Sequence, residues 1–111
     1  MSSQLRAVSI AVAIFYFSVA TYHFIRAGGI EPAVIAETIL GLVMTAGILG
    51  IIRSPLATYV LMLAGTLFGL TIVTLIGGPF TVDFWIHIVM LAGIALGFLI
   101  IQSARGRTRS I

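Results

Sequence analysis

The sequence has no cysteine, no lysine and few charged residues of either sign. The absence of cysteine excludes disulfide bonds, thiolate metal sites and thiol catalysis. Charged residues make up 8% of the 111 residues, whereas soluble domains carry about 25%. Because so few charges cannot cover the surface of a folded chain with hydrated groups, most of that surface must contact lipid.

Motifs for catalysis and nucleotide binding are also absent. The chain contains no Ser-His-Asp order, no H-E-x-x-H, no P-loop and no dinucleotide-binding fingerprint. We therefore expect a protein that is not an enzyme and has no catalytic residues. The net charge of +3 would suggest nucleic acid in a soluble protein. Here the arginines flank apolar segments, which points to orientation in a membrane, and we expect no nucleic-acid partner.

The chain is rich in long apolar segments, which lie at residues 7–25, 33–52, 56–76 and 84–101. Each is close to the ~20 residues that a helix needs to cross a hydrocarbon core of ~30 Å. None shows the period-2 alternation of a membrane β-barrel. We therefore predict an all-α membrane protein with four transmembrane helices in a single domain, residues 1–111, that ends in a basic tail, residues 102–111.

The connections between the segments are short and contain glycine or proline. Short connections make consecutive helices antiparallel, which predicts an up-down-up-down bundle. With both chain ends on one side, that side holds five arginines and the opposite side only Arg26. The five are Arg6, Arg53, Arg105, Arg107 and Arg109. By the positive-inside rule both termini should be cytoplasmic, and we expect an integral protein of a prokaryotic plasma membrane.

Small residues recur at helical spacing in the last three segments. Gly65 and Gly69 form one G-x-x-x-G pair, Gly93 and Gly97 form a second, and Gly41 has Thr45 at the same spacing. Such faces let helix backbones approach closely and pack through van der Waals contact. We expect these glycines to pack helices, either within the chain or against a partner subunit or a second copy.

Four functional side chains fall near the outer ends of the segments: His23, Glu37, Asp83 and His87. The two histidines lie at similar depth on segments that an up-down bundle makes neighbours. Polar groups inside a bilayer tend to face the bundle interior, because lipid cannot satisfy them. Glu37 should therefore be protonated or paired, and Arg26 across the short turn is the expected partner.

Three interpretations of these side chains stay open. They could be interfacial anchors, since His, Tyr and Trp suit the headgroup level and acids suit helix starts. His23 and His87 could bind a haem or a metal, with Asp83 or Glu37 orienting a ligand. Glu37, Asp83 and the histidines could instead form a proton or cation pathway.

The length and the number of spans are similar to those of the small multidrug resistance transporters. That resemblance would imply a dimeric transporter with an essential glutamate in the middle of its first helix. Residues 7–25 contain no carboxylate, so the motif that carries the family's function is missing and no function is transferred.

Three functions follow from these patterns. The first is a small non-catalytic integral membrane subunit packed within a larger membrane complex, with lipid and other membrane subunits or a second copy as partners. It rests on the missing catalytic motifs, the short loops and the small-residue faces. The second is a haem- or metal-binding redox subunit using His23 and His87. The third is a small homo-oligomeric transporter or proton pathway using Glu37 and Asp83.

Overall fold

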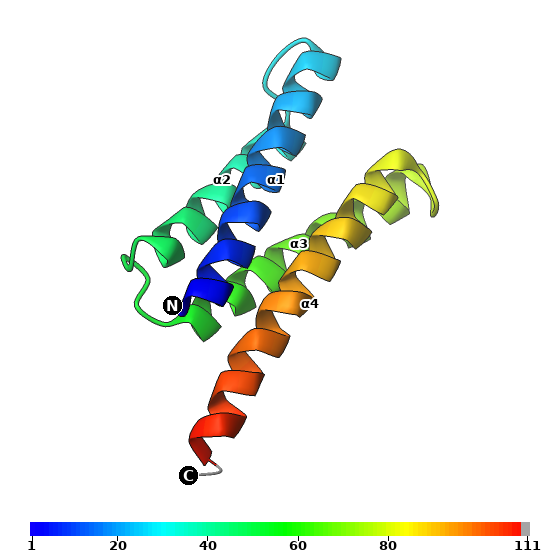
Figure 1. Ribbon diagram of the computed structural model, residues 1–111. Coiled ribbons are helices and arrows are strands. Elements are labelled where there is room, and N and C mark those ends of the chain that lie inside the picture. The colour runs from blue at the N-terminus through cyan, green and yellow to red at the C-terminus, as the bar shows by residue number, and fades with distance from the viewer. Residues whose placement is uncertain (110–111) are drawn as a thin grey trace.

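Four α-helices account for most of the chain in the computed structural model, which describes residues 1–109 and the side chains of residues 1–106. The helices are α1 Ser3–Ala27, α2 Pro32–Ile48, α3 Pro55–Gly77 and α4 Val82–Arg109 (Figure 1). The prediction of an all-α protein with four helices is confirmed.

The helices begin where the sequence supplies a cap or a proline. The side chains of Ser2 and Ser54 each accept a hydrogen bond of 3.1 Å from the backbone N–H three residues further on. Thr81 caps α4 in the same way, at 3.2 Å. Pro32 and Pro55 occupy the first turns of α2 and α3, where the N–H that proline lacks would have no partner in any case.

The C-terminus of α2 lies earlier than the sequence predicts. Gly50 has a φ of +80°, and the N–H of Ile51 returns to the carbonyl of Ala46 at 2.9 Å. This is the Schellman ending, in which a glycine in the left-handed conformation stops the helix. The helix therefore ends at Ile48, and the predicted continuation to residue 52 is wrong. Gly28, with a φ of +72°, closes α1 in the same manner.

The C-terminus of α4 lies later than predicted. The expected helix of residues 84–101 extends from Val82 to Arg109, so residues 102–109 of the predicted basic tail are helical. This stretch contains no proline, and glutamine, alanine and arginine all favour helix, so a helix that is already formed continues through it. Residues 110 and 111 of that tail lie outside the described residues.

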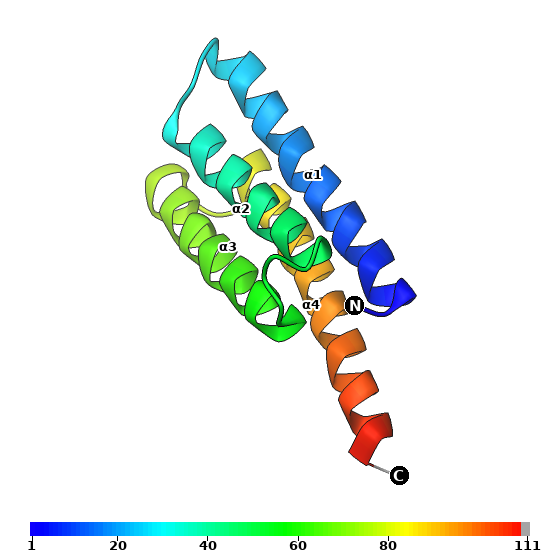
Figure 2. The same ribbon diagram turned by 90° about the vertical axis from the view of Figure 1, so that its left-hand side faces the viewer.

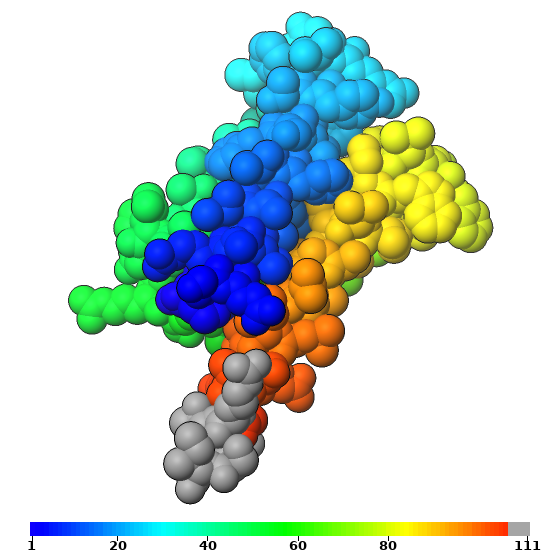
Figure 3. Space-filling view, in the orientation of Figure 1, coloured from blue at the N-terminus to red at the C-terminus, as the bar shows by residue number. Residues whose placement is uncertain are grey.

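The helices pack as two hairpins. α1 contacts α2 and α4, and α3 also contacts α2 and α4; Figure 2 shows α2 beside α3 on the near face. The hairpins α1–α2 and α3–α4 diverge toward the ends that carry connections 28–31 and 78–81, and the space-filling view shows these ends standing apart (Figures 1 and 3). The last turns of α4 project beyond the other helices.

The centre of the bundle contains hydroxyl groups as well as apolar side chains. The hydroxyl oxygens of Ser9 and Tyr59 lie 2.8 Å apart, and the hydroxyls of Tyr16 and Thr66 form a second short hydrogen bond. Both bonds link α1 to α3, which are not neighbours in the bundle. The largest side chains with no exposed surface are Tyr16, Tyr59, Met44, Met62 and Ile94.

Three helical segments are long and apolar enough to cross a membrane: α1, α3 and residues 82–106 of α4. α2 has 17 residues and rises about 25 Å, which is shorter than a hydrocarbon core of ~30 Å. Large apolar side chains face outward; Ile25, Leu75 and Ile76 are 73%, 78% and 84% exposed. Since such a surface is stable in lipid, the structure is consistent with an integral membrane protein.

Candidate functional site

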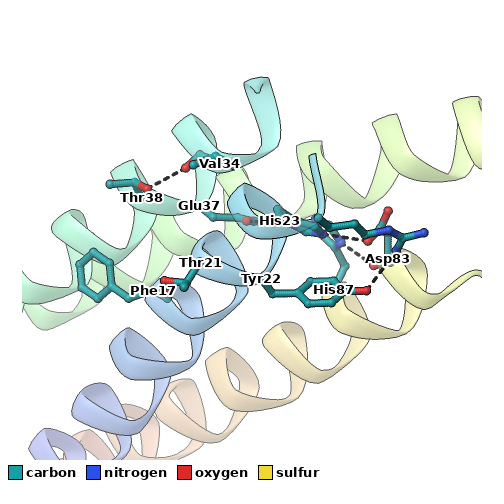
Figure 4. A network of polar contacts seen from close by, with 10 residues as sticks. Phe17, Thr21, Tyr22, His23, Val34, Glu37, Thr38, Asp83 and His87 are labelled. Atoms are coloured by element: carbon teal, nitrogen blue, oxygen red, sulfur yellow. Dashed lines mark hydrogen bonds and ion pairs between the residues drawn. The ribbon is translucent and has the colours of Figure 1, made fainter. Parts of the chain in front are cut away.

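The four polar side chains near the predicted outer ends lie together where the hairpins diverge. His23 comes from the last turns of α1, Glu37 from the second turn of α2, and Asp83 and His87 from the first two turns of α4. Figure 4 shows His23 between Glu37 and Asp83. The side chains of Glu37 and Asp83 therefore both contact the imidazole of His23, although they lie 14 and 60 residues from it in the sequence.

His23 bridges two carboxylates. Its Nδ1 lies 2.8 Å from Glu37, and its Nε2 lies 2.9 Å from Oδ1 of Asp83. The residue is only 6% exposed. The contact with Glu37 stays inside the α1–α2 hairpin, whereas the contact with Asp83 joins that hairpin to α4.

Glu37 is buried and incompletely satisfied. Both of its oxygens lie 2.8 Å from Nδ1 of His23, but only Oε2 has hydrogen-bond geometry toward it. Oε1 is closed to solvent and has no hydrogen-bond partner among the described residues. A buried carboxylate oxygen without a donor is costly, so this atom marks a charge that the helices do not fully compensate.

Two protons are enough to satisfy the hydrogen bonds of the cluster formed by His23, Glu37 and Asp83. Each of the two bonds needs one proton between nitrogen and oxygen. Either an imidazolium faces two carboxylates, or a neutral imidazole faces one carboxylate and one carboxylic acid. Both arrangements contain the same protons and the same net charge, +1 − 2 = −1 in the first and 0 − 1 = −1 in the second.

The three side chains of the cluster differ sharply in their exposed fraction. The side chain of Asp83 is 42% exposed, whereas those of His23 and Glu37 are 7% and 5% exposed. The imidazole therefore stands between a carboxylate that meets the surface and one that is enclosed by the bundle. A histidine in that position can take a proton on one nitrogen and release a different one from the other.

His87 stands apart from the bridge. Its Nδ1 lies 2.7 Å from the backbone carbonyl of Asp83, and because a carbonyl can only accept, Nδ1 carries the proton. When the ring is neutral, Nε2 is an acceptor, and among the described residues no donor reaches it. The side chain is nevertheless buried, with the residue 7% exposed.

A pocket of about 340 Å³ lies beside these groups, between the two hairpins. His23, Glu37, Asp83 and His87 all contribute to its wall. The rest of the lining is mostly apolar and includes Met90, Leu40, Phe68, Ile72, Val73 and Ala36. The pocket thus joins an apolar chamber to the anionic cluster.

The prediction that Arg26 pairs with Glu37 is wrong. Arg26 donates from Nη1 to the hydroxyl of Tyr22 at 3.0 Å and lies 6.0 Å from the centroid of that ring. Because Tyr22 precedes Arg26 by one turn of α1, the guanidinium is held along its own helix. His23 takes the place that the sequence assigned to the arginine.

The five glycines expected to pack helices all face side chains from a neighbouring helix of the same chain. A Cβ added to any of these glycines would lie 3.0 Å or less from that side chain. The pairs are Gly41 with Phe17, Gly65 with Leu40, Gly69 with His87, Gly93 with Val12 and Gly97 with Tyr59. These glycines serve the contacts between the chain's own helices.

A bis-histidine haem site needs, on each histidine, one ring nitrogen that can bind the iron. His23 does not offer one. Its two nitrogens both face carboxylates at hydrogen-bond distance. Only Nε2 of His87 is without a partner among the described residues. Within residues 1–106, no group of three or more histidine or carboxylate side chains is arranged to hold a metal ion. The arrangement does not fit a bis-histidine haem site.

Sequence reasoning missed Thr66 as a contributor to the site and assigned Gly69 to helix packing alone. Thr66 pairs with Tyr16 on the pocket wall, and Gly69 makes the space that His87 occupies. Threonine and glycine are common in membrane helices, so neither stands out by type. Their spacing of three residues on α3 was the available signal, because it places both on the face that carries the pocket.

Comparison with known proteins gives no assignment. The sequence matches no protein-family model, and no curated protein or solved structure matches the chain.

Proposed function

We propose that this chain is a proton-conducting membrane protein in which Asp83, His23 and Glu37 pass protons between the membrane surface and the buried pocket. The observation that carries the proposal is the bridge: one buried imidazole contacts an exposed carboxylate and an enclosed one. Interfacial anchors would be solvated separately, and no anchoring role requires a histidine to join two acids.

The transfer needs no group from outside the cluster. A proton that arrives on Asp83 moves to Nε2 as the Nδ1 proton moves to Oε2 of Glu37. One O–H and one N–H bond break, one N–H and one O–H bond form, and the imidazole changes tautomer. Glu37 then carries the proton on the pocket side. Once Glu37 has released it, a flip of the imidazole ring returns the N–H to the side of Glu37, and Asp83 can pass on another proton.

In the proposed orientation the helices cross the membrane up-down-up-down, with both termini in the cytoplasm of a prokaryotic cell. The arginine distribution supports this, since five of the six arginines lie on the side that holds the start of α1 and the end of α4. Asp83 then opens to the outer surface. The shorter α2 crosses if the bilayer thins locally or its flanking residues reach the interface.

The accessory-subunit hypothesis has less support. The glycine faces that suggested a partner are occupied by side chains of the same chain. Missing catalytic motifs fit a proton pathway equally well. A bridge of buried ionisable groups is costly in lipid and would have no purpose in a subunit that only packs against others.

Proton flux in vesicles tests the proposal. Purified protein is reconstituted into liposomes containing a pH-sensitive dye, and a potassium diffusion potential drives protons inward. We expect Glu37→Gln to lower the flux by about tenfold or more, because the amide cannot take the proton from His23. Glu31→Gln, which removes a carboxylate at the pocket rim outside the bridge, should keep most of the flux.

Two results would overturn the proposal. One is a flux that is the same for the natural protein, Glu37→Gln and protein-free vesicles. The other comes from infrared difference spectra recorded between acid and neutral pH. These should contain a carboxylic-acid band that disappears in Glu37→Gln, and its absence from the natural protein would show that Glu37 does not exchange a proton.

A further inference from the structure

The pocket beside the relay has a charge without a counterion. With two protons in its hydrogen bonds, the cluster of His23, Glu37 and Asp83 carries −1, and Glu31 adds a further acid to the wall. No arginine contributes to the lining, and Arg26 is held on Tyr22. A buried negative charge of this kind favours a cation beside it.

The wall also holds an unused hydrogen-bond acceptor. Nδ1 of His87 donates to the carbonyl of Asp83, which leaves Nε2 as an acceptor. His87 and Gly69 both line the pocket, and a Cβ on Gly69 would lie 2.8 Å from Nε2. The absence of a side chain on Gly69 therefore makes room for the imidazole at the pocket wall. When the ring is neutral, a ligand that brings an N–H can donate to Nε2.

The remaining lining determines what the cation must look like. Apolar side chains make up most of the wall, so the bound molecule must bring an apolar body that displaces water favourably. A hard metal cation needs about six or more oxygen ligands, and this wall does not supply them. An organic cation with a large apolar part satisfies the charge, the acceptor and the chamber together.

We propose that this pocket binds an apolar protonated amine, whose charge is held by the His23–Glu37–Asp83 cluster and whose N–H is accepted by Nε2 of His87. The inference rests on the proposed function because it uses the same cluster, and it names the class of molecule whose binding the protons would accompany. When the amine occupies the site, it supplies the positive charge that a third proton would otherwise bring to the cluster.

The pocket can be entered from the lipid side. Phe68 lines it and is 70% exposed on the outward face of α3, and Ala36 is exposed on the neighbouring face of α2. An amphiphilic amine concentrates in the membrane interface, so it can reach this opening without crossing the aqueous connection loops.

Binding is measured with three probes that share two benzyl groups on one central atom, using the full chain in lipid nanodiscs and calorimetry against empty nanodiscs. Dibenzylammonium has both a charge and N–H groups, dibenzyldimethylammonium has the charge alone, and dibenzyl ether has neither. We expect saturable binding of dibenzylammonium. The affinity should be about tenfold lower for the quaternary ion and lower again for the ether. Equal affinity for the ether and the ammonium would overturn the proposal.

Variants of the natural chain locate the site. Glu37→Gln should reduce dibenzylammonium affinity by about tenfold or more, and Gly69→Ala should do the same because its methyl group occupies the space beside Nε2. Gly93→Ala is the control, since its methyl group would also meet a side chain, that of Val12 at 3.0 Å, but Gly93 does not line this pocket. Equal loss of affinity in Gly93→Ala and Gly69→Ala would contradict the role of His87.

The two proposals fail separately. If the infrared carboxylic-acid band of Glu37 is present but dibenzylammonium binds no better than the ether, the amine site is wrong and the relay stands. If the charge-dependent binding is present but the band is absent, the relay is wrong and the amine site stands. The infrared spectra require no amine, and the binding measurement requires no observation of proton exchange.

Discussion

At the scale of the residue, His23 shows what a sequence can and cannot predict about this site. Sequence analysis brought together His23, Glu37, Asp83 and His87 from helix periodicity and depth. It assigned Arg26 to Glu37 because opposite charges attract, and that assignment was wrong. Periodicity gives the face and depth of a residue. It does not give the reach of a side chain, and Arg26 can reach its own Tyr22 at one turn's distance.

Gly97 is the glycine where a single methyl group should have the largest effect. A Cβ there would overlap the ring of Tyr59, which is fully buried and hydrogen-bonded to Ser9, so the ring has no room to move. We expect Gly97→Ala to lower the free energy of unfolding by about 1–3 kcal/mol, measured by equilibrium unfolding in mixed micelles.

Gly106 on the same helix provides the control. A Cβ at this position has no atom within 4 Å, so alanine adds helix propensity without a clash. Gly106→Ala should therefore be neutral or stabilise by up to about 1 kcal/mol. Equal destabilisation by both substitutions would mean that the loss at Gly97 comes from the helix backbone and not from contact with Tyr59.

At the scale of the element, the four helices were predictable and their ends were not. Apolar length placed all four, because only helices and closed barrels satisfy the backbone in lipid and the sequence lacks the alternating pattern of a barrel. The end of α2 depends on Gly50 adopting a left-handed conformation, and Ile51 and Ile52 are as apolar as the helix before them. The end of α4 was placed where apolar residues stop, although helix formation itself does not require an apolar side chain.

Two hydroxyl pairs tie α1 to the diagonally opposite α3 and should set their relative height. Tyr16→Phe and Thr66→Val remove one pair, and a double-mutant cycle isolates its coupling. We expect about 0.6 kcal/mol and no more than ~2 kcal/mol of coupling in the free energy of unfolding. The same cycle run on Tyr16 with Thr74, which lies two turns further along α3, should give no coupling; a similar value there would refute the direct bond.

At the scale of the whole molecule, we propose that charge distribution orients the chain, while the length of its apolar helices keeps it in lipid. The absence of cysteine makes the orientation easy to measure, since single cysteines can be introduced without background. We expect Ser3→Cys and Ser103→Cys to be protected from an impermeant maleimide in intact cells. Gly29→Cys, in the α1–α2 connection, should be labelled. The reverse pattern would place Asp83 on the cytoplasmic side and invert the direction of the relay.

The bond between His23 and Asp83 has a mechanical consequence as well as a chemical one. This hydrogen bond joins the α1–α2 hairpin to α4, at the end where the hairpins stand apart (Figure 1). If this contact lengthens, Val12 still packs against Gly93 further along the two helices, but the ends of α1 and α4 beside the pocket lose this link. In the proposed relay, the position of a proton on His23 or Asp83 would therefore also set how firmly these two helix ends are held together.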